Sequence, residues 1–206
     1  MGKTKTWITQ RKNEYYYKKA KEENYRSRAT YKLSETIVKY GFIKFGDVVV
    51  DLGAAPGGWI QAARKVAGKR GFVLGVDLKA IAPFEQPYIR TIIGDMTEPE
   101  MVEQILCFLP RKADVVLSDM SPNISGVWEV DHARQIDLAT KALETAGKIL
   151  RPGGNFFIKA FEGELFNDYF RKVQTQFEKV TLVKPKASRT KSSEMYILAL
   201  GFKAAE

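Results

Sequence analysis

Short runs rich in β-branched residues alternate with stretches of helical periodicity along most of this chain. Seven runs are predicted to be strands, at 47–51, 72–77, 89–93, 114–118, 155–159, 179–183 and 195–200. Helices are predicted at about 28–40, 59–67, 98–108, 131–150 and 164–176, the fourth ending at a Pro-Gly stop. This alternation predicts an α/β protein with a mostly parallel, seven-stranded sheet and helices on both faces.

The last two predicted strands are separated by a loop and not by a helix, which favours an antiparallel hairpin at the sheet edge. In open α/β sheets, ligands bind beyond the carboxyl ends of the parallel strands. An antiparallel last strand would begin on that same rim. The residues expected there are Gly53, Asp77, Asp95, Asp119, Lys159 and Glu194.

A chain of 206 residues is long enough for one domain with a substantial core, so we expect a single domain over 1–206. Its formal net charge is +9, and residues 1–32 alone hold ten Lys or Arg against three Glu, a net of +7. We call residues 1–26 the N-terminal arm. It also carries Tyr15, Tyr16 and Tyr17.

Basic residues interleaved with aromatic ones suit a phosphate backbone and unstacked bases. The alternative is a solvated helix whose tyrosines pack on the domain. A second basic cluster favours RNA, and it comprises Lys184, Lys186, Arg189 and Lys191.

Other classes of protein find little support in the sequence. No apolar run approaches the roughly 20 residues that span a bilayer, and the N-terminus lacks the apolar region of a secretory signal. Cys107 is the only cysteine, and His132 is the only histidine and has no partners for a metal site. We therefore expect a cytoplasmic monomer without bound metal or membrane contact.

The segment "DLGAAPGGWI", residues 51–60, places a turn almost without side chains after a hydrophobic strand. Its G-x-A-x-x-G pattern, 53–58, is close to the dinucleotide fingerprint, although such a turn can also serve tight packing. Asp77 ends the next strand, 24 residues after Gly53, where an acid can bind ribose hydroxyls. A P-loop is excluded because its G-x-x-x-x-G-K-[ST] pattern is absent from the sequence.

The charge near this turn indicates what kind of ligand it takes. Asp51 would repel a pyrophosphate at the helix N-terminus, where a nicotinamide dinucleotide would place one. A ligand with an adenosine end and a cationic end fits better. S-adenosylmethionine has both, and Asp51 or Asp119 can receive its ammonium group.

Five segments resemble, in order, the motifs of the FtsJ/RrmJ family of RNA ribose 2′-O-methyltransferases. They are "SRATYKL", "DLGAAPGGW", "SDMSPNISG", "FFIKAFEGE" and "SSEMYIL", and the resemblance covers about 14–201. It implies the Rossmann-like, seven-stranded fold of S-adenosylmethionine-dependent methyltransferases. It also implies a catalytic Lys–Asp–Lys–Glu tetrad, comprising Lys32, Asp119, Lys159 and Glu194. The cofactor-binding residues expected are Asp51, Gly53, Ala54, Pro56, Gly58, Trp59, Asp77, Leu78, Asp95, Met96 and Asp119.

Each member of the implied tetrad has an expected role. A ribose hydroxyl is a poor nucleophile, so the protein must position it and manage one proton. We expect Lys159 to be the base or to stabilise the incipient alkoxide, with Asp119 orienting it, while Lys32 and Glu194 steer the ribose. Nearby cations lower the pKa of a lysine and carboxylates raise it, so the direction for Lys159 stays open. Tyr196 is assigned only to the last strand.

The predicted function is methylation of a ribose 2′-hydroxyl in RNA, at a uridine of large-subunit (23S) ribosomal RNA. Within the family, the alternative is an enzyme acting on the tRNA anticodon loop. Two alternatives come from other classes: a non-catalytic RNA-binding protein with a vestigial fold, and a nicotinamide oxidoreductase. The tetrad argues against the first, since binding alone does not need Lys159 and Glu194 on one rim.

Overall fold

The computed structural model describes residues 5–188 and 192–204, with the backbone alone for 5–13. Arg189 and Lys191 of the predicted second basic cluster lie outside the described residues. Within the described part, no helix is both long and apolar enough to cross a bilayer.

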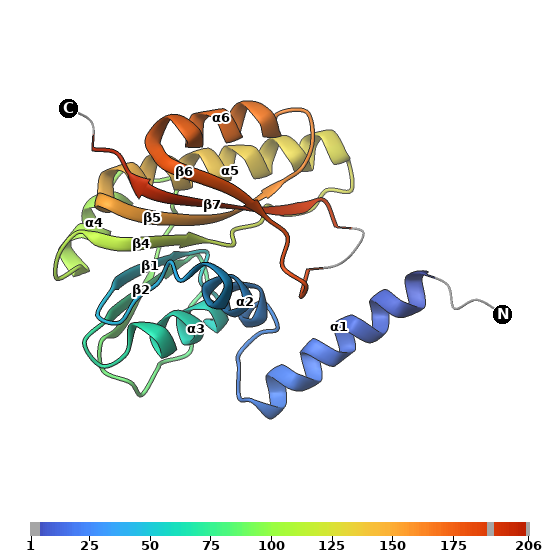
Figure 1. Ribbon diagram of the computed structural model, residues 1–206, viewed down its shortest axis with the longest axis horizontal. Helices are drawn as coiled ribbons and strands as arrows, with labels where there is room; N and C mark the ends of the chain where they lie inside the picture. Colours follow the sequence, from blue (N-terminus) through green and yellow to red (C-terminus); the bar gives the residue numbers. More distant parts are fainter. Residues whose placement is uncertain (1–4, 189–191, 205–206) are drawn as a thin grey trace.

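One seven-stranded sheet forms the centre of the molecule (Figure 1). Its strands are β1 Val48–Leu52, β2 Phe72–Asp77, β3 Ile89–Ile93, β4 Ala113–Ser118, β5 Leu150–Phe161, β6 Phe177–Val183 and β7 Glu194–Phe202. Their order is β3-β2-β1-β4-β5-β7-β6, and β7 is antiparallel to both of its neighbours. The predicted α/β class and the antiparallel hairpin at the edge are therefore confirmed. Strand β7 inserts between β5 and β6, so β6 is the edge.

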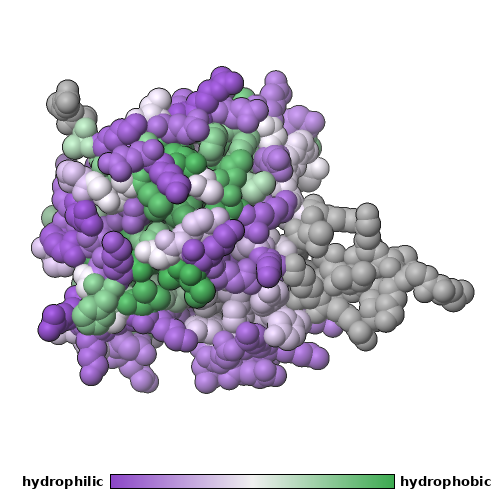
Figure 2. Space-filling view, in the orientation of Figure 1, coloured by the Kyte–Doolittle hydropathy of each residue, from purple (hydrophilic) through white to green (hydrophobic). Residues whose placement is uncertain are grey.

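Within the described residues, six helices accompany the sheet: α1 Lys5–Glu22, α2 Thr30–Tyr40, α3 Gly58–Ala67, α4 Met101–Phe108, α5 Trp128–Ile149 and α6 Phe166–Gln176. Helices α2 and α3 cover one face of the sheet, and α5 and α6 cover the other (Figure 1). Hydrophilic residues dominate the outer surfaces of α6 and α3, at the top and bottom of Figure 2, as expected for helices that bury one face.

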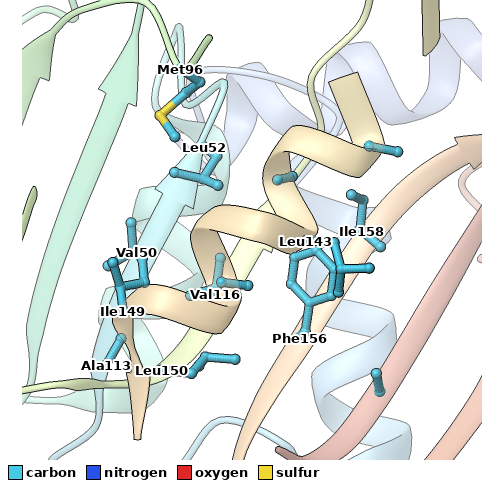
Figure 3. Close-up of a cluster of buried hydrophobic side chains, with 14 of the residues drawn as sticks. Val50, Leu52, Met96, Ala113, Val116, Leu143, Ile149, Leu150, Phe156 and Ile158 are labelled. Atoms are coloured by element: carbon cyan, nitrogen blue, oxygen red, sulfur yellow. The ribbon is translucent and has the colours of Figure 1, made fainter. Parts of the chain in front are cut away.

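The sheet separates two hydrophobic cores. Val50, Val116 and Ile158 pack under α5 on one side (Figure 3), whereas Val49 and Phe157 pack under α2 and α3 on the other. Successive strand residues point to opposite faces, so a strand covered on both faces must be apolar throughout. This explains the continuous apolar run that precedes the glycine-rich turn.

Helix α1 extends from the domain and touches it near its carboxyl end (Figure 1). The contact is a small cluster formed by Ala20, Tyr31 and Ala187, with Tyr16 packed against it. Tyr16 also donates a hydrogen bond to Glu35 at 3.1 Å, while Tyr15 and Tyr17 are exposed. The arm thus packs Tyr16 and Tyr25 against this cluster and leaves Tyr15 and Tyr17 in solvent.

Candidate active site

The four implied catalytic residues meet at one rim of the sheet. Lys32 comes from α2, Asp119 follows β4, Lys159 lies on β5 and Glu194 begins β7. Lys32 Nζ lies 3.0 Å from Glu194 Oε2. Lys159 Nζ donates to the backbone oxygen of Asp119 at 2.8 Å and forms an ion pair with its Oδ1 at 3.3 Å. Since β7 is antiparallel to β5, its first residue reaches the rim where the parallel strands end.

A fifth residue, Tyr196, links these two pairs. Its hydroxyl accepts a hydrogen bond from Lys32 Nζ at 2.9 Å and donates one to Asp119 Oδ1 at 2.9 Å. The result is a continuous network that runs Glu194, Lys32, Tyr196, Asp119, Lys159. From the sequence, Tyr196 is predicted only as a residue of the last strand. The signal was available, because Tyr196 stands two residues after Glu194 and therefore points to the same face of β7.

The network is electrostatically balanced, with two lysines and two carboxylates. Burial raises the pKa of Tyr196 well above its usual value, and the charges of Asp119 and Glu194 add to the shift, so the phenol stays protonated. For Glu194, burial acts to raise the pKa, but Lys32 and Lys159 outweigh it and the net shift is downward. Glu194 is therefore an ionised partner of Lys32.

A cavity of ≈ 840 Å³ opens beside the network. Six of the predicted cofactor residues line it: Gly53, Asp77, Leu78, Asp95, Met96 and Asp119. The Asp77 carboxylate accepts backbone hydrogen bonds from Ala55 at 2.9 Å and from Lys79 at 2.8 Å, which fixes it at the end of β2.

Asp95 is held at the next strand end in a similar way. Its Oδ1 accepts from the backbone nitrogen and the hydroxyl of Thr97, at 2.8 and 2.7 Å. These bonds lower the pKa of Asp95, against a smaller opposing effect of burial. Two oriented carboxylates thus face one cavity, and both suit the hydroxyl and amino donors of an adenosine.

The glycine-rich turn has two functions. Gly53 has φ +75° and lines the cavity, and a Cβ there would lie 2.5 Å from Met120 Cγ. Gly58 faces the other way, because a Cβ there would collide with the Ser27 and Thr30 hydroxyls ahead of α2. Trp59 donates from Nε1 to the backbone oxygen of Ala29 at 2.8 Å. Part of the turn therefore anchors the helix that carries Lys32.

Five predicted cofactor residues do not line the cavity: Asp51, Ala54, Pro56, Gly58 and Trp59. Ala54 and Trp59 are buried in the core beneath α2 and α3. Pro56 is exposed, and its carbonyl accepts a bond from Arg26 at 3.4 Å. For Ala54, Pro56, Gly58 and Trp59 the structure supports a packing role, whereas Asp51 lies buried behind the cavity wall.

Arg26 joins the N-terminal arm to the loop that covers the turn. Its guanidinium donates to the carbonyls of Ala82 at 2.6 Å and Pro83 at 2.7 Å, and it stacks on Phe84 at 3.6 Å. The start of α2, and with it Lys32, is therefore fixed relative to the cavity from two sides.

Asp51 is a buried carboxyl whose two oxygens have no hydrogen-bond partner among the described residues. Burial raises its pKa well above the usual range, and the charges of Asp119 and Asp77 add to the effect. A buried acid beside two others favours a cationic group nearby. Together with the cavity and its two oriented carboxylates, this fits S-adenosylmethionine, which joins an adenosine to a cationic end.

A sheet of this order, with a cavity at its carboxyl rim beside a lysine–carboxylate network, is that of a Rossmann-like methyltransferase. Among the described residues, no group of His, Cys, Asp and Glu could hold a metal ion. A family model described as FtsJ-like methyltransferase matches residues 25–202, and the chain belongs to this family.

Individual relatives agree with this assignment. The chain is 51% identical over 203 residues to ribosomal RNA large subunit methyltransferase E of Methanococcus maripaludis, which covers 98% of this chain and 79% of the relative. A Plasmodium falciparum crystal structure, of a protein assigned as a ribosomal RNA methyltransferase, has a TM-score of 0.78 and 26% identity. The match covers 88% of this chain and 100% of that one.

A more distant structure shares the fold alone. Fibrillarin of Aeropyrum pernix, crystallised with natively bound S-adenosylmethionine, has a TM-score of 0.60 and 18% identity. That match covers 82% of this chain and 76% of fibrillarin.

Proposed function

We propose that this protein methylates a ribose 2′-hydroxyl of large-subunit ribosomal RNA, at a uridine, with S-adenosylmethionine as the methyl donor. The observation that carries the proposal is the buried network that holds Lys159 against Asp119 at the edge of the cavity. The relatives named as large-subunit ribosomal RNA methyltransferases support the substrate class.

The residues that would hold the cofactor follow from the cavity. Asp77 and Asp95 would bind the adenosine hydroxyls and amine, Gly53 would leave room for the cofactor's amino-acid chain, and Asp119 would face its cationic end, with the negative charge of buried Asp51 behind the cavity wall. When bound, the cofactor supplies an activated methyl group. Everything else in the reaction is positioning and the handling of one proton.

Lys159 is the residue placed to act on the 2′-oxygen. A lysine ammonium has three donors, of which one is used for the backbone oxygen of Asp119, while Asp119 Oδ1 lies at ion-pair distance. The remaining hydrogen-bonding capacity of Lys159 would serve the ribose, either to take its proton as an amine or to stabilise the alkoxide as an ammonium. Lys32 and Glu194, tied to each other at 3.0 Å, complete the wall against which the ribose lies.

The N-terminal arm supplies the electrostatic attraction for RNA. Lys18 and Lys21 are exposed on α1, as are Tyr15 and Tyr17, so charge and aromatic surface are both available to a strand. The enzyme acts in the cytoplasm as a monomer, and one domain over 1–206 carries both the arm and the site.

Mapping of ribose methylation tests the proposal. Ribosomal RNA from cells with and without the gene is compared by reverse transcription at limiting nucleotide, which stops at 2′-O-methyl groups. One uridine of the large-subunit RNA should lose its methyl group and regain it with the parent gene, but not with Lys159→Ala. Loss of methylation only in a tRNA anticodon loop would instead assign the enzyme to that substrate.

A further inference from the structure

An exposed aromatic stack stands on the same rim as the network and takes no part in it. Trp128, the first residue of α5, stacks on His132 with 5.6 Å between ring centroids and 17° between planes. It also stacks on Phe161, at 6.0 Å and 18°. His132 and Phe161 are 4% and 6% exposed, whereas Trp128 is 43% exposed. The indole is therefore the most exposed of the three rings, and its plane is nearly parallel to each of the other two.

The imidazole of His132, one of the two buried rings, is held in place by its own contacts. His132 Nε2 accepts a hydrogen bond from the backbone nitrogen of Leu165 at 3.0 Å, which leaves the ring proton on Nδ1. Gly163 lies against the imidazole so closely that a Cβ there would be 2.8 Å from it. The stack is thus a rigid support, fastened to the connection between β5 and α6.

The loop that leads into α5 is also fixed. The Asp131 carboxylate accepts from the backbone nitrogen and the hydroxyl of Ser125, both at 2.8 Å, and from the nitrogen of Gly126 at 3.1 Å. Ile124 and Val127 on this loop are exposed, and Leu165 on the far side is exposed as well. Trp128 therefore stands on a fixed loop end, with exposed apolar residues before it in the chain.

The position of the stack relates it to the catalytic network. Phe161 stands two residues after Lys159 on β5, about 7 Å further along the strand, at the rim where α5 begins. Its register partner on β7 is Glu194, while the partner of Lys159 is Tyr196. A ribose held at Lys159 would thus leave its own base, or the adjacent one, within reach of the indole.

The charges around Trp128 select what can bind there. Glu129 follows Trp128 directly, and Glu164 lies close enough to His132 to act on its pKa. These carboxylates disfavour a phosphate group or an anionic lipid surface. A nucleobase is uncharged and has the flat face that an aromatic ring stacks on, so it suits this surface best.

We propose that Trp128, supported by His132 and Phe161, is a stacking platform for an unpaired base of the substrate RNA within one nucleotide of the methylated ribose. The inference rests on the proposed function and adds a binding site to it. The phosphates of the strand then point away from the acidic rim of the platform, towards the basic arm.

Three variants test the platform: Trp128→Ala, Trp128→Phe and, as a matched control, Phe45→Ala. Phe45 is another exposed aromatic residue, but it precedes β1 at the opposite end of the strands. With in vitro transcribed large-subunit ribosomal RNA, Trp128→Ala should lower kcat/KM about 5- to 150-fold, mainly through KM, the effect of one lost base stack. Trp128→Phe should keep most of the activity and Phe45→Ala all of it. Calorimetry should give the parent's S-adenosylmethionine affinity in all three.

Abasic substrates identify the base. In a synthetic RNA spanning the mapped site, the base is removed in turn at the methylated nucleotide and at each neighbour. At one of these positions the losses from base removal and from Trp128→Ala should overlap instead of multiplying. Multiplicative losses at all three positions, or the parent's kcat/KM in Trp128→Ala, overturn the platform while leaving the proposed function intact. A parent protein that methylates no RNA overturns the proposed function, and the platform with it.

Discussion

Tyr196→Phe removes one oxygen atom from the centre of the network and leaves the ring in place. The ring stacks on Phe157 at 5.1 Å between centroids, so the aromatic packing persists. What is lost is the bond from Lys32 and the bond to Asp119, both 2.9 Å long and both to charged partners. Lys32 keeps Glu194 and Asp119 keeps Lys159, so no charge is left unpaired.

The magnitude follows from these contacts. A hydrogen bond to a charged group contributes about 1.5–3 kcal/mol to stability. Two such bonds are lost, but Lys32 and Asp119 each keep an ion pair, so we expect the total loss to equal that of about one bond. We therefore expect the free energy of unfolding to fall by about 1.5–3 kcal/mol. For a chain of 206 residues this corresponds to a Tm lowered by about 3–12 °C.

The assay pairs chemical denaturation with single-turnover methylation of bound RNA. Tyr196→Phe should lower both stability and rate, because Lys32 and Asp119 lose their common partner. Tyr169→Phe is the control, since that hydroxyl is also buried and donates to the Ala139 carbonyl at 3.0 Å, away from the rim. It should cost about 0.5–1.5 kcal/mol and leave the rate unchanged. An unchanged rate and stability in Tyr196→Phe would refute the network as a functional unit.

Three further predictions concern the lysines and Glu194. Lys159→Ala should abolish methylation without weakening cofactor binding, and Glu194→Ala should lower the methylation rate less. Arginine keeps the positive charge but does not take the proton, so activity retained in Lys159→Arg would show that Lys159 acts as a fixed cation. Gln at Lys18 and Lys21 should lower the log–log salt slope of RNA binding by about 0.7 per lost phosphate contact; an unchanged slope would make α1 a structural face. Because the pKa of Glu194 is lowered, its ion pair with Lys32 stabilises the fold above about pH 4.5, and this stabilisation is lost as the pH falls further. In denaturation measured at several pH values, Glu194→Gln should remove this acid sensitivity.

The order and type of the strands followed from the sequence because the central strands β1, β2 and β4 are buried on both faces, whereas helix α1 was not among the predicted helices. Burial on two sides forces continuous β-branched runs, and these are what the strand prediction detects. The boundaries were less predictable. Helix α5 begins at Trp128, three residues before the expected position, because Asp131 holds the preceding loop from within the first turn. Strand β5 begins at Leu150, directly after α5, where the Pro-Gly stretch predicted a turn.

The site was predictable where single residues mark the ends of strands, and less so where side chains meet across the fold. Lys32 lies 162 residues from Glu194 along the chain, and their pairing requires β7 to insert between β5 and β6. Tyr196, which lies between them, cannot be told from an ordinary strand residue until the pairing of β7 with β5 is known. The same applies to Gly58, where an added Cβ would collide with the Ser27 and Thr30 hydroxyls at the start of α2.

The chemical position of the transferred methyl group tests the account most directly. The parent protein is incubated with in vitro transcribed large-subunit ribosomal RNA and S-adenosylmethionine labelled in its methyl group, and the RNA is then hydrolysed in alkali. Alkaline cleavage requires a free 2′-hydroxyl, so a methylated ribose protects the bond that follows it. The account predicts label in an alkali-resistant dinucleotide that begins with uridine, and none with Lys159→Ala. Label recovered in mononucleotides would place the methyl group on a base and contradict the assignment of the network to a ribose hydroxyl.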